Sequence, residues 1–229
     1  MSMTMELTRQ RDLINLERLS QIRILMIGAG GIGSFAAHAL AKMGVENLQV
    51  WDKDLLESHN IPNQNFNLDQ VGKSKVEALQ HNIYEATHTN INAKYDFFTS
   101  DISYQPDIII SGVDSMVQRK LIYDGLKEET KSQPIYYLDA RMSARAMSVF
   151  ALRFDNPKSM ERYASSLYSD AEAEQERCTA KSIIHTPYAC AYVLGTIVHA
   201  IINNTPVYGS YHGILNDMRF TKEKFIINN

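Results

Sequence analysis

The sequence predicts an α/β fold: a Rossmann-like, doubly wound, mostly parallel sheet with helices on both faces and antiparallel strands toward the C-terminus. Two observations carry this prediction. Short apolar runs alternate with stretches of helical spacing between residues 22 and 139, and this alternation is typical of parallel sheets covered by helices. In addition, the first apolar run ends in a glycine-rich turn, after which a helical stretch begins.

The first elements follow from hydrophobic spacing and helix signals. Residues 6–21 carry leucines and isoleucines at roughly helical spacing and are expected to form a helix that leads into the core. Residues 22–27 form a continuous apolar run, as a buried parallel strand does. Residues 32–43 are alanine-rich and end at Gly44, a residue common at helix C-termini. With a strand at 48–51, they complete a β-α-β unit.

The alternation then continues beyond a polar loop at 54–69. The elements expected up to residue 139 are a helix over 72–86, strands over 91–98 and 106–111, a helix over 116–129 and a strand over 135–138. After residue 139 the pattern changes. The elements expected there are an antiparallel strand over 146–152, a loop or loose helix over 155–180, a buried helix over 186–203 and a hairpin after residue 206.

The composition is that of an ordinary globular protein. The 229 residues are 45% hydrophobic and carry a net charge of 23 − 26 = −3, which gives no broad field for nucleic acid or an anionic membrane. No apolar run approaches the roughly 20 residues of a membrane span. We therefore expect one domain over 1–229. Its parts would be an N-terminal helix or arm (1–21), a nucleotide-binding core (22–139), and outer strands, a crossover loop and a C-terminal helix (140–229).

The chain has only two cysteines, Cys178 and Cys190. This number excludes a disulfide framework and a four-cysteine zinc site, so no zinc is expected. The N-terminus is polar and mixed in charge, unlike a signal peptide. These features predict a reduced, cytoplasmic protein.

The glycine-rich turn fits the pattern G-x-G-x-x-G. Its glycines are Gly28, Gly30, Gly31 and Gly33. Such a turn lets a phosphate approach the backbone, and the following helix start offers free N–H groups to an anion. Asp52 follows Gly28 by 24 residues, where an acid commonly holds the ribose hydroxyls of either NAD or ATP. The alternative is that the glycines serve only the turn and its packing.

The second crossover favours ATP over NAD. It places carboxylate, amide and ammonium groups over the edge of the sheet, in the stretches Asp52-Lys53-Asp54, Asn60-Ile61-Pro62-Asn63-Gln64 and Val71-Gly72-Lys73-Ser74-Lys75. Ammonium groups neutralise the charge that develops on a nucleoside triphosphate. A plain dehydrogenase has no need of them in this crossover.

Asp114 follows the apolar run at 106–111. A carboxylate at the C-terminal end of a central parallel strand lies in the crevice where such sheets bind ligands. Mg²⁺ prefers one or two carboxylates together with phosphate oxygens, so Asp114 is the candidate metal ligand. The alternative is a helix N-cap for the helix that begins near Met116.

These motifs together resemble the ThiF/MoeB/HesA superfamily, to which ubiquitin-activating enzymes also belong. The resemblance runs from about Thr8 to Leu152, and weakly beyond. The matching elements, in family order, are Arg9-Gln10, the G-A-G-G-I-G loop, D-K-D, Asn60 with Gln64, V-G-K-S-K, G-V-D-S with Arg119, and Ala140-Arg141-Met142.

The resemblance implies a set of residue roles. The glycines and Ser34 would line an ATP site, Asp52 would bind ribose, and Asp54 and Asn60 would lie near the phosphates. Lys75 would contact the phosphates, and Asp114 would ligate Mg²⁺. Arg9 matches a family arginine that enters the partner's ATP site, which implies a homodimer. The alternative for Arg9 is a solvated helix charge.

Two departures from the family pattern stand out. Asn63 replaces an arginine that stabilises the phosphates, so either Lys73, Lys53 or an arginine of a partner compensates, or turnover is impaired. The paired C-x-x-C zinc site of many members is absent. Cys178-Thr179 resembles the position at which ubiquitin-activating members form a thioester, whereas an inert cysteine is the alternative. Cys190 lies in an apolar helical run and is expected in the core.

The sequence therefore predicts an ATP- and Mg²⁺-dependent adenylyltransferase. Its substrate would be the C-terminus of a small ubiquitin-like or sulfur-carrier protein, or a peptide, activated as an acyl adenylate with release of pyrophosphate. A thioester on Cys178 would be a further step. Two other interpretations stay open, a non-catalytic binding protein of the same fold and an NAD-dependent oxidoreductase.

Overall fold

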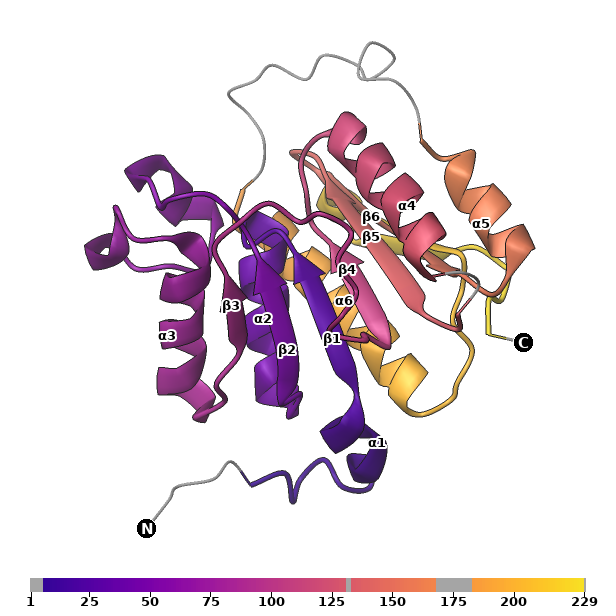
Figure 1. The fold of residues 1–229 in the computed structure, drawn as a ribbon, viewed down its shortest axis with the longest axis horizontal. Helices are drawn as coiled ribbons and strands as arrows, with labels where there is room; N and C mark the ends of the chain where they lie inside the picture. The colour runs from indigo at the N-terminus through magenta and orange to yellow at the C-terminus, as the bar shows by residue number, and fades with distance from the viewer. Residues whose placement is uncertain (1–5, 131–132, 168–182, 229) are drawn as a thin grey trace.

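The computed structural model describes residues 6–130, 133–167 and 183–228. They form one eight-stranded sheet in the order β3-β2-β1-β4-β5-β6-β7-β8 (Figure 1). Strands β3 to β5 in this order are parallel, and β6, β7 and β8 are antiparallel to their neighbours. The strands are β1 (Arg23–Ile27), β2 (Asn47–Trp51), β3 (Asn92–Lys94), β4 (Ile108–Ser111), β5 (Tyr136–Met142), β6 (Ala146–Arg153), β7 (Ser210–Ile214) and β8 (Arg219–Lys222).

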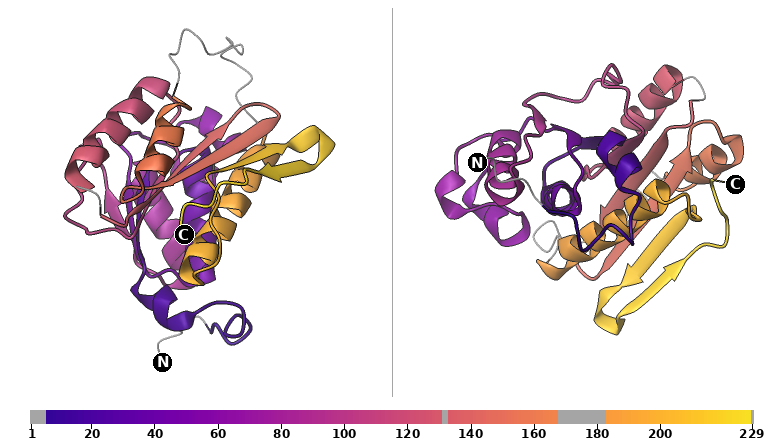
Figure 2. Two further views of the ribbon diagram at one scale, coloured as in Figure 1. Left: turned by 90° about the vertical axis from the view of Figure 1, so that its right-hand side faces the viewer. Right: turned by 90° about the horizontal axis from the view of Figure 1, so that it is seen from below.

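Helices cover both faces of the sheet (Figure 2). They are α1 (Leu16–Gln21), α2 (Gly31–Met43), α3 (Lys75–Thr87), α4 (Met116–Thr130), α5 (Pro157–Ala164) and α6 (His185–Ile202). Strand β1 alternates between two cores: Ile24 and Met26 pack with α2, α3 and α6, whereas Leu25 and Ile27 pack with α4 and α5. The predicted doubly wound, Rossmann-like fold class is confirmed.

The N-terminal stretch differs from the prediction of a helix over residues 6–21. The helix is confined to α1, because Asn15 caps it: its side-chain oxygen accepts a hydrogen bond from the Arg18 N–H at 3.0 Å. Residues 8–13 form turns instead. An asparagine at an N-cap favours an extended backbone there and stops the helix from continuing backward.

Two further stretches differ from the prediction in extent or in regularity. Strand β5 runs on to Met142 rather than ending at residue 138, because it pairs along its whole length with β6. Part of the stretch expected as a loop or loose helix is the regular helix α5, with Pro157 in its first turn and Asn156 as its N-cap. Among the described helices, none is both long and apolar enough to span a membrane.

Candidate nucleotide site

The candidate residues meet at one edge of the sheet, where the adjacent parallel strands β2, β1 and β4 end. Gly28 and Asp52 directly follow β1 and β2, and Asp114 lies three residues after β4. In open α/β sheets, ligands bind outside the carboxyl ends of the strands where the strand order reverses, which here is between β1 and β4. The order of the sheet therefore places these groups in the expected crevice.

The glycine loop needs its glycines for distinct steric reasons. Gly28 has a φ of +95°, and a Cβ at Gly33 would lie 1.8 Å from the Gly28 carbonyl oxygen. The loop can therefore form only without side chains at these two positions. A Cβ at Gly30 would meet nothing within 4 Å, so this position opens onto free space at the start of α2, where an anion could approach.

Asp52 joins the glycine loop to the next loop. One carboxylate oxygen accepts from the Ala29 N–H at 2.7 Å, and the other accepts from the Asp54 N–H at 2.8 Å. Each carboxylate oxygen can accept more than one hydrogen bond. Asp52 therefore stabilises the loop while keeping lone pairs for ligand hydroxyls.

Lys75 lies beside this loop, in the first turn of α3. Its ammonium is 2.8 Å from an Asp54 carboxylate oxygen, and the two side chains are 9% and 51% exposed. The backbone N–H of Lys75 also donates to the Asp54 carbonyl at 3.0 Å. The pair thus holds a nearly buried cation next to a carboxylate that faces solvent.

The turn formed by Ser58–Asn63 folds against the start of α2. The buried Ser34 hydroxyl accepts from the Asn65 N–H at 3.0 Å, and a Cβ at Gly31 would lie 3.1 Å from the Asn63 carbonyl oxygen. The Asn60 side-chain oxygen accepts from the Glu57 N–H at 3.0 Å. Ser34 therefore holds this loop against the start of α2, and Asn60 stabilises the turn itself.

Gln64 ends this turn with an unpaired acceptor. Its side-chain Oε1 is buried and has no hydrogen-bond partner in the part of the chain that the structure describes. A buried acceptor without a partner costs about 1–3 kcal/mol. A bound ligand that donates to it would remove this cost.

Asp114 is exposed at the carboxyl edge. The described residues contain no cluster of three or more histidine, cysteine or acidic side chains that could hold a metal by themselves. Mg²⁺ is usually bound by one or two carboxylates together with substrate phosphates. A single carboxylate at this edge fits that donor set.

Arg9 does not join the other candidate residues. Leu7, two residues before it, lies where a Cβ on Gly44 would be, at the far end of α2 from the glycine loop. The carbonyl of Leu13 accepts hydrogen bonds from His199 and Asn203, at the C-terminal end of α6. The N-terminal stretch therefore lies where the parallel strands begin (Figure 1).

The predictions for the two cysteines have different outcomes. Cys178 lies outside the described residues, so its predicted thioester role stays a prediction. Cys190 is fully buried in α6, and burial raises the pKa of its thiol to about 12. Its expected place in the core is confirmed.

A buried charge network under the crevice was not foreseen. Asp139 of β5 is fully buried, and its carboxylate contacts both Arg119 and Arg141 and accepts from the Tyr163 hydroxyl at 3.1 Å. Burial is the main reason that the pKa of Tyr163 is raised, so the phenol stays protonated and donates. The sequence did contain a signal for this network. Every second residue of a strand lies on the same face, and on β5 these residues are Tyr137, Asp139 and Arg141.

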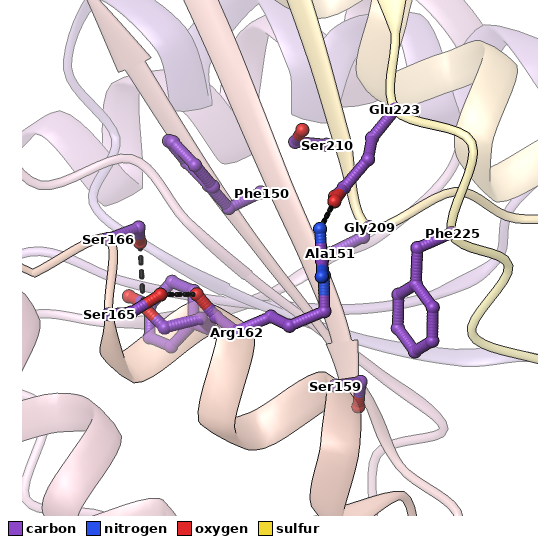
Figure 3. A pocket seen from close by; sticks show the side chains of 11 residues that line it. Phe150, Ala151, Ser159, Arg162, Ser165, Ser166, Gly209, Ser210, Glu223 and Phe225 are labelled. Atoms are coloured by element: carbon purple, nitrogen blue, oxygen red, sulfur yellow. Dashed lines mark hydrogen bonds and ion pairs between the residues drawn. The ribbon is translucent and has the colours of Figure 1, made fainter.

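A cavity of about 370 Å³ lies next to this network, between α5, β6 and β7 (Figure 3). The ion pair of Arg162 with Glu223 crosses it, and Tyr163 and Ser166 form part of its wall. None of its lining residues belongs to the candidate nucleotide set. It is a neighbour of the crevice and not the crevice itself.

The glycine loop, the acid after β2 and the edge where the strand order reverses place the chain in the Rossmann-like class, with a candidate nucleotide site at this edge. The chain belongs to the ThiF family, whose model matches residues 4–222. The resemblance seen in the motifs is thereby confirmed.

Individual relatives match parts of the chain. Probable molybdopterin-synthase adenylyltransferase of Porphyra purpurea is 34% identical over 121 residues, 50% of this chain and 32% of that protein. Ubiquitin-like modifier-activating enzyme 5 of Drosophila grimshawi is 29% identical over 164 residues, 64% of this chain and 40% of that protein. The chain thus spans less than half the length of these curated relatives.

Solved structures share the fold. PaaA superposes with a TM-score of 0.71 at 20% identity, and E. coli MccB with ATP has a TM-score of 0.71 at 15% identity. In both cases the match covers 92% of this chain and 66% of the other. At these identities the likeness shows the fold alone.

Proposed function

We propose that the chain is an ATP- and Mg²⁺-dependent adenylyltransferase that activates the carboxylate at the C-terminus of a ubiquitin-like or sulfur-carrier protein, or of a peptide. One observation carries this proposal: contacts run from Ala29 of the glycine loop through Asp52 and Asp54 to the Lys75 ammonium. A nearly buried cation so linked to the loop suits a triphosphate, whose charge it neutralises. The names of the two curated relatives support the same activity.

The proposed reaction is an attack of the substrate carboxylate on the α-phosphorus of ATP. The new bond joins a carboxylate oxygen to phosphorus, the bond to the bridging oxygen breaks, and pyrophosphate leaves with the electron pair. The carboxylate is already ionised at neutral pH, so no general base is needed. The task of the chain is to position the two reactants and to neutralise charge.

Each side chain has a distinct part in this scheme. The open space at Gly30 and the start of α2 would receive phosphate, and Asp52 would accept from the ribose hydroxyls. Lys75 would neutralise phosphate charge. Asp114 would hold Mg²⁺ together with the phosphates, and the ion would supply further charge neutralisation. Asn63 supplies no cation, so either Lys53, Lys73 or a partner arginine compensates or turnover is impaired.

We propose a homodimer from the role that the family resemblance implies for Arg9. Leu7, two residues before Arg9, lies against Gly44 at the far end of α2 from the glycine loop, so this role would require the site of a second copy. Arg9→Ala and Lys75→Met would each be inactive alone. If the sites are shared, mixing the two variants restores part of the activity, and no recovery after confirmed subunit exchange rejects the shared site.

Pyrophosphate exchange tests the reaction. With ATP, labelled pyrophosphate and small carrier proteins that end in Gly-Gly, the chain should form labelled ATP only when its carrier is present. Lys75→Met should slow exchange by about 100-fold, whereas Lys127→Met, which changes an exposed lysine of α4, should not. ATP binding without exchange by any carrier would favour a non-catalytic binding protein. Binding of NADH but not ATP would favour an oxidoreductase.

The thioester step has its own test. A conjugate of carrier and enzyme that reducing agent cleaves should disappear in Cys178→Ala, while exchange continues. Cys190→Ala is the matched control, because that thiol is buried in α6 and stays protonated. A conjugate that survives in Cys178→Ala would assign the step elsewhere.

A further inference from the structure

Burying the Asp139 carboxylate costs solvation free energy. Its side chain is fully enclosed, and it brings the Arg119 and Arg141 guanidiniums with it, at 5% and 12% exposure. Removing charges from water costs several kcal/mol per ion, and apolar side chains of similar volume often stabilise a fold as well or better. Stability alone is therefore a poor reason for this network.

Arg119 uses its other donors on backbone carbonyl groups. One nitrogen donates to the Val113 carbonyl, and the nitrogen that contacts Asp139 also donates to the Ala140 carbonyl at 3.1 Å. Val113 directly precedes Asp114 in the turn between β4 and α4. The Arg119 guanidinium thus links β5 to the turn that carries Asp114, the candidate metal ligand.

The same turn also touches the glycine loop. The Gly112 N–H donates to the Ile27 carbonyl at 2.9 Å, and a Cβ on Gly28 would lie 3.4 Å from the Gly112 carbonyl group. A Cβ on Gly112 would in turn lie 3.3 Å from Ile32. With so little free space, a shift of Val113 moves Asp114 relative to the place where phosphate would bind.

Arg141 holds the other side of Asp139. Its Nε is 2.8 Å from a carboxylate oxygen, and its two terminal nitrogens donate to the Ser166 carbonyl and hydroxyl at 2.9 and 3.1 Å. The Tyr163 hydroxyl of α5 donates to the same carboxylate oxygen. Side chains of α4, β5 and α5 therefore contact Asp139 and restrict its movement.

We infer that Asp139 is a positioning residue of the nucleotide site: it fixes Arg119 against the Val113 carbonyl and so sets where Asp114 meets the metal-bound phosphates. This inference rests on the proposed function. In Asp139→Asn, an NH2 donor replaces one of the two carboxylate oxygens, and the negative charge that pairs with both guanidiniums is lost. Arg119 would lose this charged anchor and the turn would loosen, although Asp114 itself is unchanged.

The test measures how Mg²⁺ affects ATP binding, which needs no knowledge of the carboxylate substrate. The dissociation constant for ATP is measured by calorimetry with and without Mg²⁺. In the unchanged chain Mg²⁺ should tighten ATP binding, and in Asp114→Asn this gain should vanish. In Asp139→Asn the gain should fall by about 10-fold, while the affinity for ATP without Mg²⁺ stays within about twofold.

Two further variants keep the test decisive. Asp155→Asn is the control. It removes a carboxylate that pairs with Arg153 at the C-terminal end of β6, and it should leave the Mg²⁺ response unchanged. Arg119→Lys replaces Asp139→Asn if that variant does not fold, because one ammonium cannot span both Asp139 and Val113 as the guanidinium does. It should show the same reduced response.

The outcomes separate the two claims. If the unchanged chain binds no ATP, the proposed function fails. If it binds ATP with a Mg²⁺ gain that the folded Asp139→Asn or Arg119→Lys variant retains in full, the positioning role is overturned while the proposed function stands. A Mg²⁺ gain that is absent in the unchanged chain also overturns the positioning role.

Discussion

The two halves of the carboxyl edge are built differently. Around β1 and β2, the site consists of backbone groups and side chains that follow one another closely in sequence, as with the Ala29, Asp52 and Asp54 contacts. Around β4 and β5, buried side chains from three separate elements meet at Asp139. Steric limits on the backbone govern the first half, and pairing of buried charges governs the second. Substitutions in the two halves should therefore fail for different reasons.

The largest loss of stability should come from the buried-charge half. Arg119→Ala removes one cation from Asp139 and leaves the Val113 carbonyl without this donor, so the free energy of unfolding should fall by about 3–5 kcal/mol. Urea unfolding followed by circular dichroism measures it. A loss below about 1 kcal/mol would mean that the network stabilises the fold no more than an exposed ion pair does. The proposed difference between the two halves would then be wrong.

The glycine half should fail through steric overlap. In Gly33→Ala the new methyl group would lie 1.8 Å from the Gly28 carbonyl oxygen, and the required shift of the loop should cost about 3 kcal/mol. Thermal unfolding measures this loss.

Gly30→Ala is the control in the same loop. Its Cβ would enter free space, so stability should change by about 1 kcal/mol or less, while ATP affinity falls because the methyl group occupies the proposed phosphate position. Equal destabilisation by the two variants would contradict the steric account.

This difference between the two halves also explains which features could be predicted from the sequence. The βαβ unit, the glycine turn and Asp52 are local patterns with a fixed physical meaning, and the structure places them as expected. Each of these predictions needed only the spacing of residues along one crossover. The contact of Lys75 with Asp54 is not among them, because the role of Lys75 was implied by the family resemblance and not by spacing.

The remaining features depend on contacts between distant parts of the chain. The role of Ser34 in lining the ATP site stays a prediction, and its hydroxyl also accepts from the Asn65 N–H, a contact that spacing alone does not indicate. Asp139 reads as an ordinary residue at the end of a strand until Arg119, twenty positions earlier, is found against it. The spacing of Asp139 and Arg141 indicates polar side chains on one face of the strand, but the pairing of Asp139 with Arg119 of α4 becomes visible only when the sheet is assembled.

The smallest effect should come from an ion pair on the helix that also carries Arg119. Lys120 and Asp124 are 2.8 Å apart at the surface of α4, with side chains 65% and 51% exposed. A double-mutant cycle with alanine at both positions should give a coupling of about 0.3–0.5 kcal/mol, and added salt should remove most of it. Arg119 and Lys120 are neighbours in sequence, have the same formal charge and lie in one helix, so they differ mainly in burial and in the buried contacts that come with it. A coupling above about 1 kcal/mol that persists in high salt would show that exposure does not weaken this pair, and the large effect expected at Arg119 could then not be ascribed to its burial.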